Sequence, residues 1–278
     1  MSLRGIGCQP LFLNGAQGRL FALSYHPPQL LMRRHGVLIV PPFAEEMNKS
    51  RRMLSQQARL LAEEGYLTLM PDLYGTGESD GEFSDASWTG WCEDLVCGYR
   101  WLRERGVDTV SVLAQRTGAL LVTALVREKG VTLNRLVLWQ PVVSGDMFLT
   151  QFLRLRLAAE MAKGVAERSS VAQIRAELED KGTIEVAGYT LSQHLALPLG
   201  DSRMEFPAGC FAGELHWCEL VATADRAVTA VTQRALDALQ AGGVHCELHK
   251  VVGHPFWGAT EIEDLPMLQE TTRRIFLQ

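Results

Sequence analysis

The sequence has no cysteine pair at the spacing of a metal site or a redox centre. Its six cysteines are scattered over 278 residues, several of them in apolar surroundings. Such cysteines are typical of reduced, buried thiols, so we expect no disulfide framework and a cytoplasmic location. We also expect no bound metal and no cofactor. The cysteines are Cys8, Cys92, Cys97, Cys210, Cys218 and Cys246.

The chain also lacks long runs of basic residues and long runs of apolar residues. Lys and Arg number 27 against 32 Asp and Glu, which gives a net charge of -5. Nucleic-acid binding depends on a basic stripe, so we expect no nucleic-acid partner. No segment approaches the roughly 20 apolar residues of a membrane span, and the first residues lack the pattern of a secretory signal. We therefore expect a soluble, unprocessed protein.

The chain does have enough apolar residues, 47% of the total, to bury a sizeable core. From His35 onward, apolar runs of strand length alternate with longer segments of helical period. This alternation predicts an α/β fold in which helices cover both faces of a mostly parallel sheet. The predicted strands are GVLIVPPF, YLTLMPD, TVSVLAQ, RLVLWQPVV, HWCELVAT and VHCELHKVV. Predicted helices lie between the first two strands and at residues 88–105, 118–128, 228–240 and 261–277.

Two segments depart from this alternation. The segment PLFLNGAQGRLFALSYHPP, before the first parallel strand, is typical of an antiparallel hairpin at the sheet edge. Residues 146–213 form a long insertion that opens with an amphipathic stretch at 147–167 and continues into a possible short hairpin. We predict a core of residues 1–145 and 214–278, with residues 146–213 inserted either as a lid over a site or as a second packing layer.

Ligands of open parallel sheets bind beyond the carboxyl ends of the strands, so the polar residues there are the candidate site. Four groups stand at such positions: PPFAEEMNKSRRM, PDLYGTGESDG, AQRTG, and the pair ATADRAVT and VVGHPFWG. Their order along the chain is that of the α/β-hydrolase fold, in which a nucleophile at a sharp turn precedes an acid and then a histidine. We interpret PDLYGTGESDG as a structural loop, because no helix follows it at once as a phosphate-binding loop would require.

Several of these strings resemble one bacterial family. The segments PPFAEEMNKSRRM, PDLYGTGESDG, LWQPVVSGDMFLTQFLRLRLAAEM and GHPFW are similar to those of the exosortase A system-associated hydrolases, in particular hydrolase 2. The likeness runs from about residue 35 to residue 257. It implies an α/β-hydrolase fold and a link to protein export and exopolysaccharide production, and it supplies no substrate.

The candidate base is His254, which follows the last strand where the superfamily places its histidine, and which has a suitable intrinsic pKa. Asp225 follows the preceding strand, where the superfamily's acid orients the histidine. A surface turn that caps a helix is the alternative for Asp225. Asp146 is a second candidate for the acid, because it lies just past another strand.

The sequence departs from the superfamily at the sharp turn itself. AQRTG keeps small residues at both ends, but its centre is Arg116 where the GxSxG pattern has serine. A guanidinium stays protonated and has no nucleophilic lone pair, so Arg116 cannot form an acyl-enzyme. Thr117 and Ser111 are weak substitutes, since one should point toward the helix and the other lies within the strand.

Two roles remain open for Arg116. At a helix N-terminus, its charge can join free backbone amides in binding a carboxylate or phosphate. Alternatively, Glu45 or Glu46, on the loop that normally forms the oxyanion hole, can pair with Arg116 and seal the cavity.

Two functional hypotheses follow. The first is hydrolysis of a small ester, thioester or acyl conjugate by water, which His254 activates while amides near Phe43 hold the oxyanion. Glu45 or Glu46 is the alternative base. The second is a catalytically inert protein that binds an anionic small molecule or a partner. The sequence does not indicate the oligomeric state.

Overall fold

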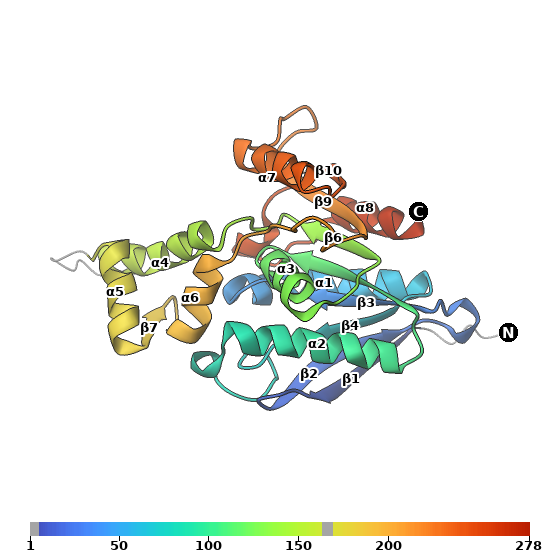
Figure 1. Cartoon of the computed structure of the whole chain (residues 1–278), viewed down its shortest axis with the longest axis horizontal. Coiled ribbons are helices and arrows are strands. Elements are labelled where there is room, and N and C mark those ends of the chain that lie inside the picture. The colour runs from blue at the N-terminus through green and yellow to red at the C-terminus, as the bar shows by residue number, and fades with distance from the viewer. Residues whose placement is uncertain (1–5, 163–168) are drawn as a thin grey trace.

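One eight-stranded sheet forms the centre of the protein (Figure 1). The computed structural model describes residues 6–162 and 169–278. The order across the sheet is β1-β2-β4-β3-β5-β6-β9-β10, in which β2 pairs antiparallel with β1 and β4 and the remaining pairs are parallel. The strands are β1 (Gly7–Asn14), β2 (Arg19–His26), β3 (His35–Val40), β4 (Leu67–Pro71), β5 (Thr109–Gln115), β6 (Arg135–Trp139), β9 (Glu214–Val221) and β10 (Cys246–Val252). The predicted α/β fold with a mostly parallel sheet is confirmed, and the N-terminal hairpin lies at the sheet edge as expected.

Helices cover both faces of the sheet. On one face, α1 (Glu45–Glu63) and α8 (Pro266–Leu277) bury Met53, Leu61 and Phe276 against alternate residues of the strands. The other face carries α2 (Trp88–Glu104), α3 (Gly118–Lys129) and α7 (Ala230–Ala241) over a larger apolar cluster. This division follows from strand geometry, because successive side chains of each buried strand point to opposite faces.

The segment between β6 and β9 extends away from the sheet, to the left in Figure 1. It contains α4 (Gly145–Ala162), α5 (Val171–Lys181), β7 (Thr183–Val186), β8 (Tyr189–Ser192) and α6 (Gln193–Asp201). The expected short hairpin is β7 with β8, which pair antiparallel. Of the amphipathic stretch at 147–167, residues 163–167 lie outside the described residues. A lid role for this segment stays a prediction.

Two helix boundaries differ from the predicted ones. α8 begins at Pro266 and not at Glu261, because proline disfavours the helical conformation in the residue before it, and Leu265 has φ -126° and ψ 78°. α7 begins at Ala230 and not at Val228, since the Thr229 side chain accepts a hydrogen bond from the Thr232 amide and caps the helix there. α6 was not predicted as a helix.

Three short 3-10 turns complete the described chain: η1 (Gln29–Leu31), η2 (Phe83–Asp85) and η3 (Phe256–Gly258). Within the described residues, every helix is too short or too polar to cross a lipid bilayer.

Candidate functional site

The sharp turn after β5 keeps the backbone of a nucleophile elbow. Arg116 has φ 53°, a left-handed conformation that is unusual for a residue with a side chain. Its amide donates to the Trp139 carbonyl at 3.0 Å, and its carbonyl accepts from the Val142 amide at 3.1 Å. A Cβ on Gly118 would lie 2.9 Å from the Val40 carbonyl oxygen, so only glycine lets α3 approach β3 this closely. The turn therefore presents residue 116 at the carboxyl end of the sheet.

The guanidinium of Arg116 is bound by Glu46, from the first turn of α1. The Arg116 Nε donates to both carboxylate oxygens at 3.3 Å, and Nη2 donates to Oε1 at 3.1 Å. The two side chains are only 17% and 22% exposed. Burial raises the pKa of Glu46, although the charge and hydrogen bonds of Arg116 act in the opposite direction. Of the two candidate glutamates, Glu46 makes the contact.

An aromatic ring covers the same guanidinium. The Arg116 Cζ lies 4.9 Å from the centroid of the Trp257 ring, which belongs to η3. This distance is within the range of a cation–π interaction. Among the described residues, the third Arg116 nitrogen, Nη1, makes only a long 3.5 Å contact with the Gln140 carbonyl oxygen. Glu46 and Trp257 thus contact the guanidinium of Arg116 on two sides, and its Nη1 makes a long hydrogen bond.

In the loop between β3 and α1, Phe43 packs against aromatic side chains from other elements. Phe43 is buried and packs edge-on against Phe83, Trp91, Phe148 and Phe152. The last two of these lie on α4, so the aromatic group attaches the inserted segment to the end of β3. The Phe43 side chain is therefore part of the apolar packing, and an oxyanion-binding role for the amides near it stays a prediction.

Glu45 and Thr117 take part in local contacts near the turn. The Glu45 Oε2 accepts hydrogen bonds from the Tyr189 hydroxyl at 3.1 Å and from the Asn48 amide nitrogen at 3.0 Å. Glu45 thereby connects α1 to β8. Thr117 is buried at the start of α3, and its carbonyl accepts from the Leu120 amide.

His254 is paired with an acid that the sequence analysis did not name. The His254 Nε2 contacts a carboxylate oxygen of Glu263, and both side chains are about half exposed. Glu263 lies in the connection to α8, within the segment predicted to be helical. Because the predicted helix at 261–277 includes Glu263, the sequence pattern did not indicate this residue as a partner of His254. The loop of His254 continues into Trp257, whose ring covers Arg116, and a common site for His254 and Arg116 stays a prediction.

The two carboxylates predicted to orient His254 have other partners. Asp225 is exposed, and hydrogen bonds from the Thr223 side chain and from its own backbone lower its pKa. Asp146 lies in the first turn of α4, where its Oδ1 accepts from Arg175 Nη2 at 2.7 Å. Asp146 thus connects α4 to α5. A catalytic role for either carboxylate stays a prediction.

The structural interpretation of the loop after β4 agrees with its contacts. Asp72 is buried, accepts from Arg51 Nη2 at 2.8 Å and from the Glu78 amide at 3.0 Å. A Cβ on Gly77 would lie 2.0 Å from the Asp72 carboxylate. The loop therefore folds around its own aspartate.

A small cleft opens beside the turn. It measures about 140 Å³ and is lined by Arg116, Ser144 and Gln151 as polar groups and by Met147, Phe148 and Val231 as apolar ones, with residues 141–143. Hollows of about 570 and 590 Å³ lie beside α2, one against β1 and one against α3 and α6. Of these three hollows, the small cleft is the one lined by Arg116 at the apex of the turn, so we take it as the candidate ligand site.

Comparisons with known proteins agree on the architecture. A family model described as "Serine aminopeptidase, S33" matches residues 34–189. Est1E from Butyrivibrio proteoclasticus with ferulic acid bound has a TM-score of 0.70 at 15% identity, over 96% of this chain and 98% of that one.

Two further solved structures show the same likeness. An α/β serine hydrolase without a lid from Xanthomonas campestris has a TM-score of 0.57 at 16% identity, over 99% and 95% of the two chains. An α/β serine hydrolase homologue from Coxiella burnetii has a TM-score of 0.57 at 15% identity, over 96% of each. These likenesses establish the α/β-hydrolase fold. No curated protein matches the chain.

Proposed function

Because this chain belongs to the serine aminopeptidase S33 family and has the α/β-hydrolase fold, we propose that it binds a small carboxylate at the turn after β5 without acyl transfer. The observation that carries the proposal is the Arg116 guanidinium, which occupies the apex of the turn and lines the cleft. The apex is the position that a nucleophilic side chain takes in this fold.

The lining of the cleft fits an amphiphilic anion. Arg116 supplies charge and a donor at Nη1, while Ser144 and Gln151 supply further polar groups. Met147 and Phe148 offer an apolar wall for a short aliphatic or aromatic tail. A carboxylate would gain a charge-assisted hydrogen bond from a nitrogen that has only a long contact without it.

Glu46 sets the strength and the pH dependence of this binding. It forms an ion pair with Arg116 and competes with a bound anion, so we expect modest affinity at pH 8. Burial raises the pKa of Glu46, so protonation of Glu46 begins above the usual range of a glutamate as the pH falls. Loss of that negative charge leaves Arg116 freer for the ligand. Binding of butyrate should therefore strengthen between pH 8 and pH 5.5, where butyrate is still ionised.

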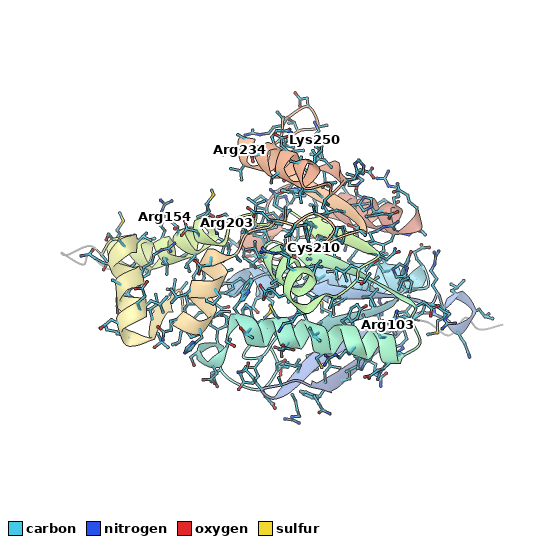
Figure 2. All side chains as sticks on the ribbon, in the orientation of Figure 1. Arg103, Arg154, Arg203, Cys210, Arg234 and Lys250 are labelled. Atoms are coloured by element: carbon cyan, nitrogen blue, oxygen red, sulfur yellow. The ribbon has the colours of Figure 1, made fainter. Side chains whose placement is uncertain are left out.

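The proposal is tested by calorimetric titration of the protein with butyrate and with ferulate, the carboxylate bound in the Est1E structure. We expect one site in the wild type and at least about a tenfold loss of affinity in Arg116→Met, about 1.4 kcal/mol. The matched control is Arg154→Ala, which removes one exposed cation of α4 that does not line the cleft; Figure 2 labels Arg154.

A double variant guards against misfolding. If Arg116→Met alone does not fold, Arg116→Met with Glu46→Leu removes both buried charges at once, which proteins tolerate better than the loss of one partner. Equal binding by wild type and by the variants that lack the guanidinium contradicts the proposal. So does the absence of any binding in the wild type.

A second candidate function is hydrolysis by water, and the contact of His254 with Glu263 favours it. A carboxylate orients the imidazole and stabilises its charged form. Here the carboxylate contacts Nε2, so Nδ1 is the nitrogen left to accept a proton from water. The test is a panel of aryl esters and acyl thioesters. Turnover that His254→Ala abolishes, without labelling of a serine by a fluorophosphonate, supports this candidate.

The resemblance to the exosortase A system-associated hydrolases suggests where the ligand comes from. On that basis, the carboxylate or acyl conjugate belongs to exopolysaccharide production or protein export, and the protein acts in the cytoplasm. Placement of the coding gene beside exosortase genes would support this part of the proposal. A coding gene with no such neighbours would count against it.

A further inference from the structure

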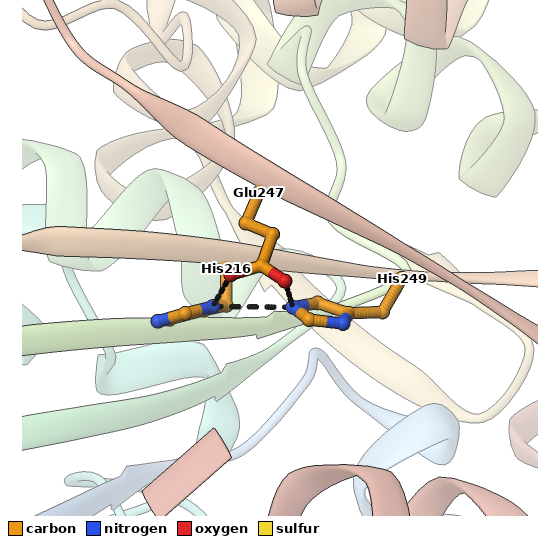
Figure 3. A group of neighbouring side chains, drawn as sticks. All are labelled: His216, Glu247 and His249. Carbon is orange, nitrogen blue, oxygen red and sulfur yellow. Dashed lines mark hydrogen bonds and ion pairs between the residues drawn. The ribbon is translucent and has the colours of Figure 1, made fainter. Parts of the chain in front are cut away.

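A second group of functional side chains lies on β9 and β10, at the opposite end of the sheet from Arg116. The two strands are parallel neighbours, and His216 is paired in register with Glu247. His249 follows Glu247 by two residues, so both point to the same face of the sheet. Figure 3 shows His216, Glu247 and His249 converging near the amino-terminal ends of the strands.

The donor atoms of this group are spaced like the ligands of a transition metal. The His216 Nδ1 lies 3.1 Å from the His249 Nε2 and 3.4 Å from a Glu247 oxygen. The other Glu247 oxygen lies 3.7 Å from the His249 Nε2. Tetrahedral ligands about 2.0–2.2 Å from a zinc ion are themselves about 3.3 Å apart. The three side chains therefore form one face of a coordination tetrahedron with little movement.

The surroundings of His216 suit a metal ligand. Its side chain is only 6% exposed, and its second nitrogen, Nε2, is buried without a hydrogen-bond partner in residues 6–162 and 169–278. A carboxylate oxygen of Glu214 lies 3.9 Å from that nitrogen. When Nδ1 binds a metal, Nε2 carries the proton and turns to such an acceptor, as ligating histidines usually do.

Two cations lie near the imidazoles. Arg135 is itself bound by Glu214, and Arg274 of α8 is the other nearby cation.

We propose that His216, Glu247 and His249 bind one Zn²⁺ ion. Two imidazoles and one carboxylate are a typical ligand set for zinc, and three protein ligands leave one position open. A hollow of about 280 Å³, lined by His216, Glu247 and His245, gives water access to that position. The ion links the edge strand β10 to β9, so it also stabilises that edge of the sheet.

The test is a titration of tag-free, EDTA-stripped protein with ZnCl₂ at pH 7.5. We expect one site per chain, a higher melting temperature with zinc, and at least about a 100-fold weaker affinity in His249→Ala, about 2.7 kcal/mol. The matched control is His245→Ala, which removes a histidine from the wall of the same hollow and should keep wild-type affinity.

Two further measurements keep the result decisive. Glu247→Gln removes a half-exposed carboxylate with little change in shape, and it should also weaken binding if His249→Ala fails to fold. Co²⁺ in place of zinc should give a tetrahedral visible spectrum without a sulfur charge-transfer band. No binding by the wild type, unchanged affinity in both variants, or a sulfur band from cysteines each overturns the proposal.

Discussion

An arginine is paired with a glutamate at both ends of the central strands, and the two pairs differ in their exposure to water. At the carboxyl end, Arg116 and Glu46 are both mostly buried. At the amino end, Arg135 is 8% exposed, but its partner Glu214 is 59% exposed. The same two residue types therefore meet in a dry setting at one end and at the protein surface at the other.

The pKa values of the two glutamates move in opposite directions. Burial raises the pKa of Glu46 in spite of Arg116. The hydrogen bond from Arg135 lowers the pKa of Glu214 and outweighs burial, which acts in the opposite direction, because water still reaches that carboxylate. The presence of an arginine partner thus does not by itself predict whether the pKa of a carboxylate is raised or lowered, because the exposure of the pair to water also matters.

The largest effect should come from breaking the buried pair. Glu46→Ala leaves the Arg116 charge without a partner in a site that water barely reaches, so we expect a loss of about 3 kcal/mol in the free energy of unfolding. The control is Glu45→Ala, whose exposed carboxylate accepts only from neutral groups, with an expected loss of about 0.5–1 kcal/mol. Urea denaturation measures both. Equal losses would contradict the difference in burial that we describe.

A second effect should appear on acidification, at the amino end. His35 hydrogen-bonds to Ser111 at 2.8 Å, and burial together with the charges of Arg135 and Arg33 lowers its pKa from 6.5 to about 4. Between these values the unfolded chain binds a proton that the folded chain does not. Stability is therefore lost as the pH falls from 6.5 to 4, by about 2 kcal/mol after allowance for partial exposure.

His35→Gln should flatten this part of the curve of unfolding free energy against pH. His194→Gln, which removes an exposed histidine, serves as the control and should keep the wild-type slope. An unchanged slope in His35→Gln would show that another group causes the loss of stability in acid.

The smallest expected effect is a difference between Glu46 and Glu214 in how their contribution to the unfolding free energy changes with pH. Because the folded pKa of Glu214 is lowered from 4.5, its contribution is present above pH 4.5 and is lost as the pH falls through the folded value. Glu214→Gln should cost about 0.5–1 kcal/mol at pH 7, given its exposure, and almost nothing at pH 3.

Glu46→Gln should act with the opposite sign. The folded pKa of Glu46 is raised, so the native protein gains stability as the pH falls through that value toward 4.5, and the variant lacks this gain. If the unfolding free energies of Glu46→Gln and Glu214→Gln changed with pH in the same way, the two glutamates would not differ in the sign of their pKa shift.

The order of the core elements was predictable because it depends on local pattern. All six parallel strands overlap the predicted runs, since buried strands are continuous apolar stretches between turn residues, although β3 begins one residue and β9 two residues before its run. The start of α8 was predicted too early, as the apolar spacing from Glu261 onward took no account of the restriction that Pro266 imposes. α6 was not predicted, in a segment where the short hairpin of β7 and β8 was the stronger pattern.

The sequence predicted that Arg116 could pair with Glu45 or Glu46, but not the partner of His254, and the functional site itself stays a prediction. Arg116, Glu46 and the loop of His254 meet at one end of the sheet, as strand order implies. The partner of His254 could not be chosen from sequence, because Glu263, Asp225 and Asp146 all follow elements that end on that side. The group of His216, Glu247 and His249 was missed because its ligands come from two strands, and only the alternation in HCELH hinted at it.

The sequence by itself determined the α/β architecture and placed a permanent cation at the apex of the turn, because strand and helix periods are local and a guanidinium is charged in any setting. Only the tertiary structure decided that Glu46 neutralises this cation, that Glu263 contacts His254, and that two histidines of neighbouring strands converge with Glu247. These choices depend on the register and the hydration of side chains distant along the chain, which no local pattern encodes.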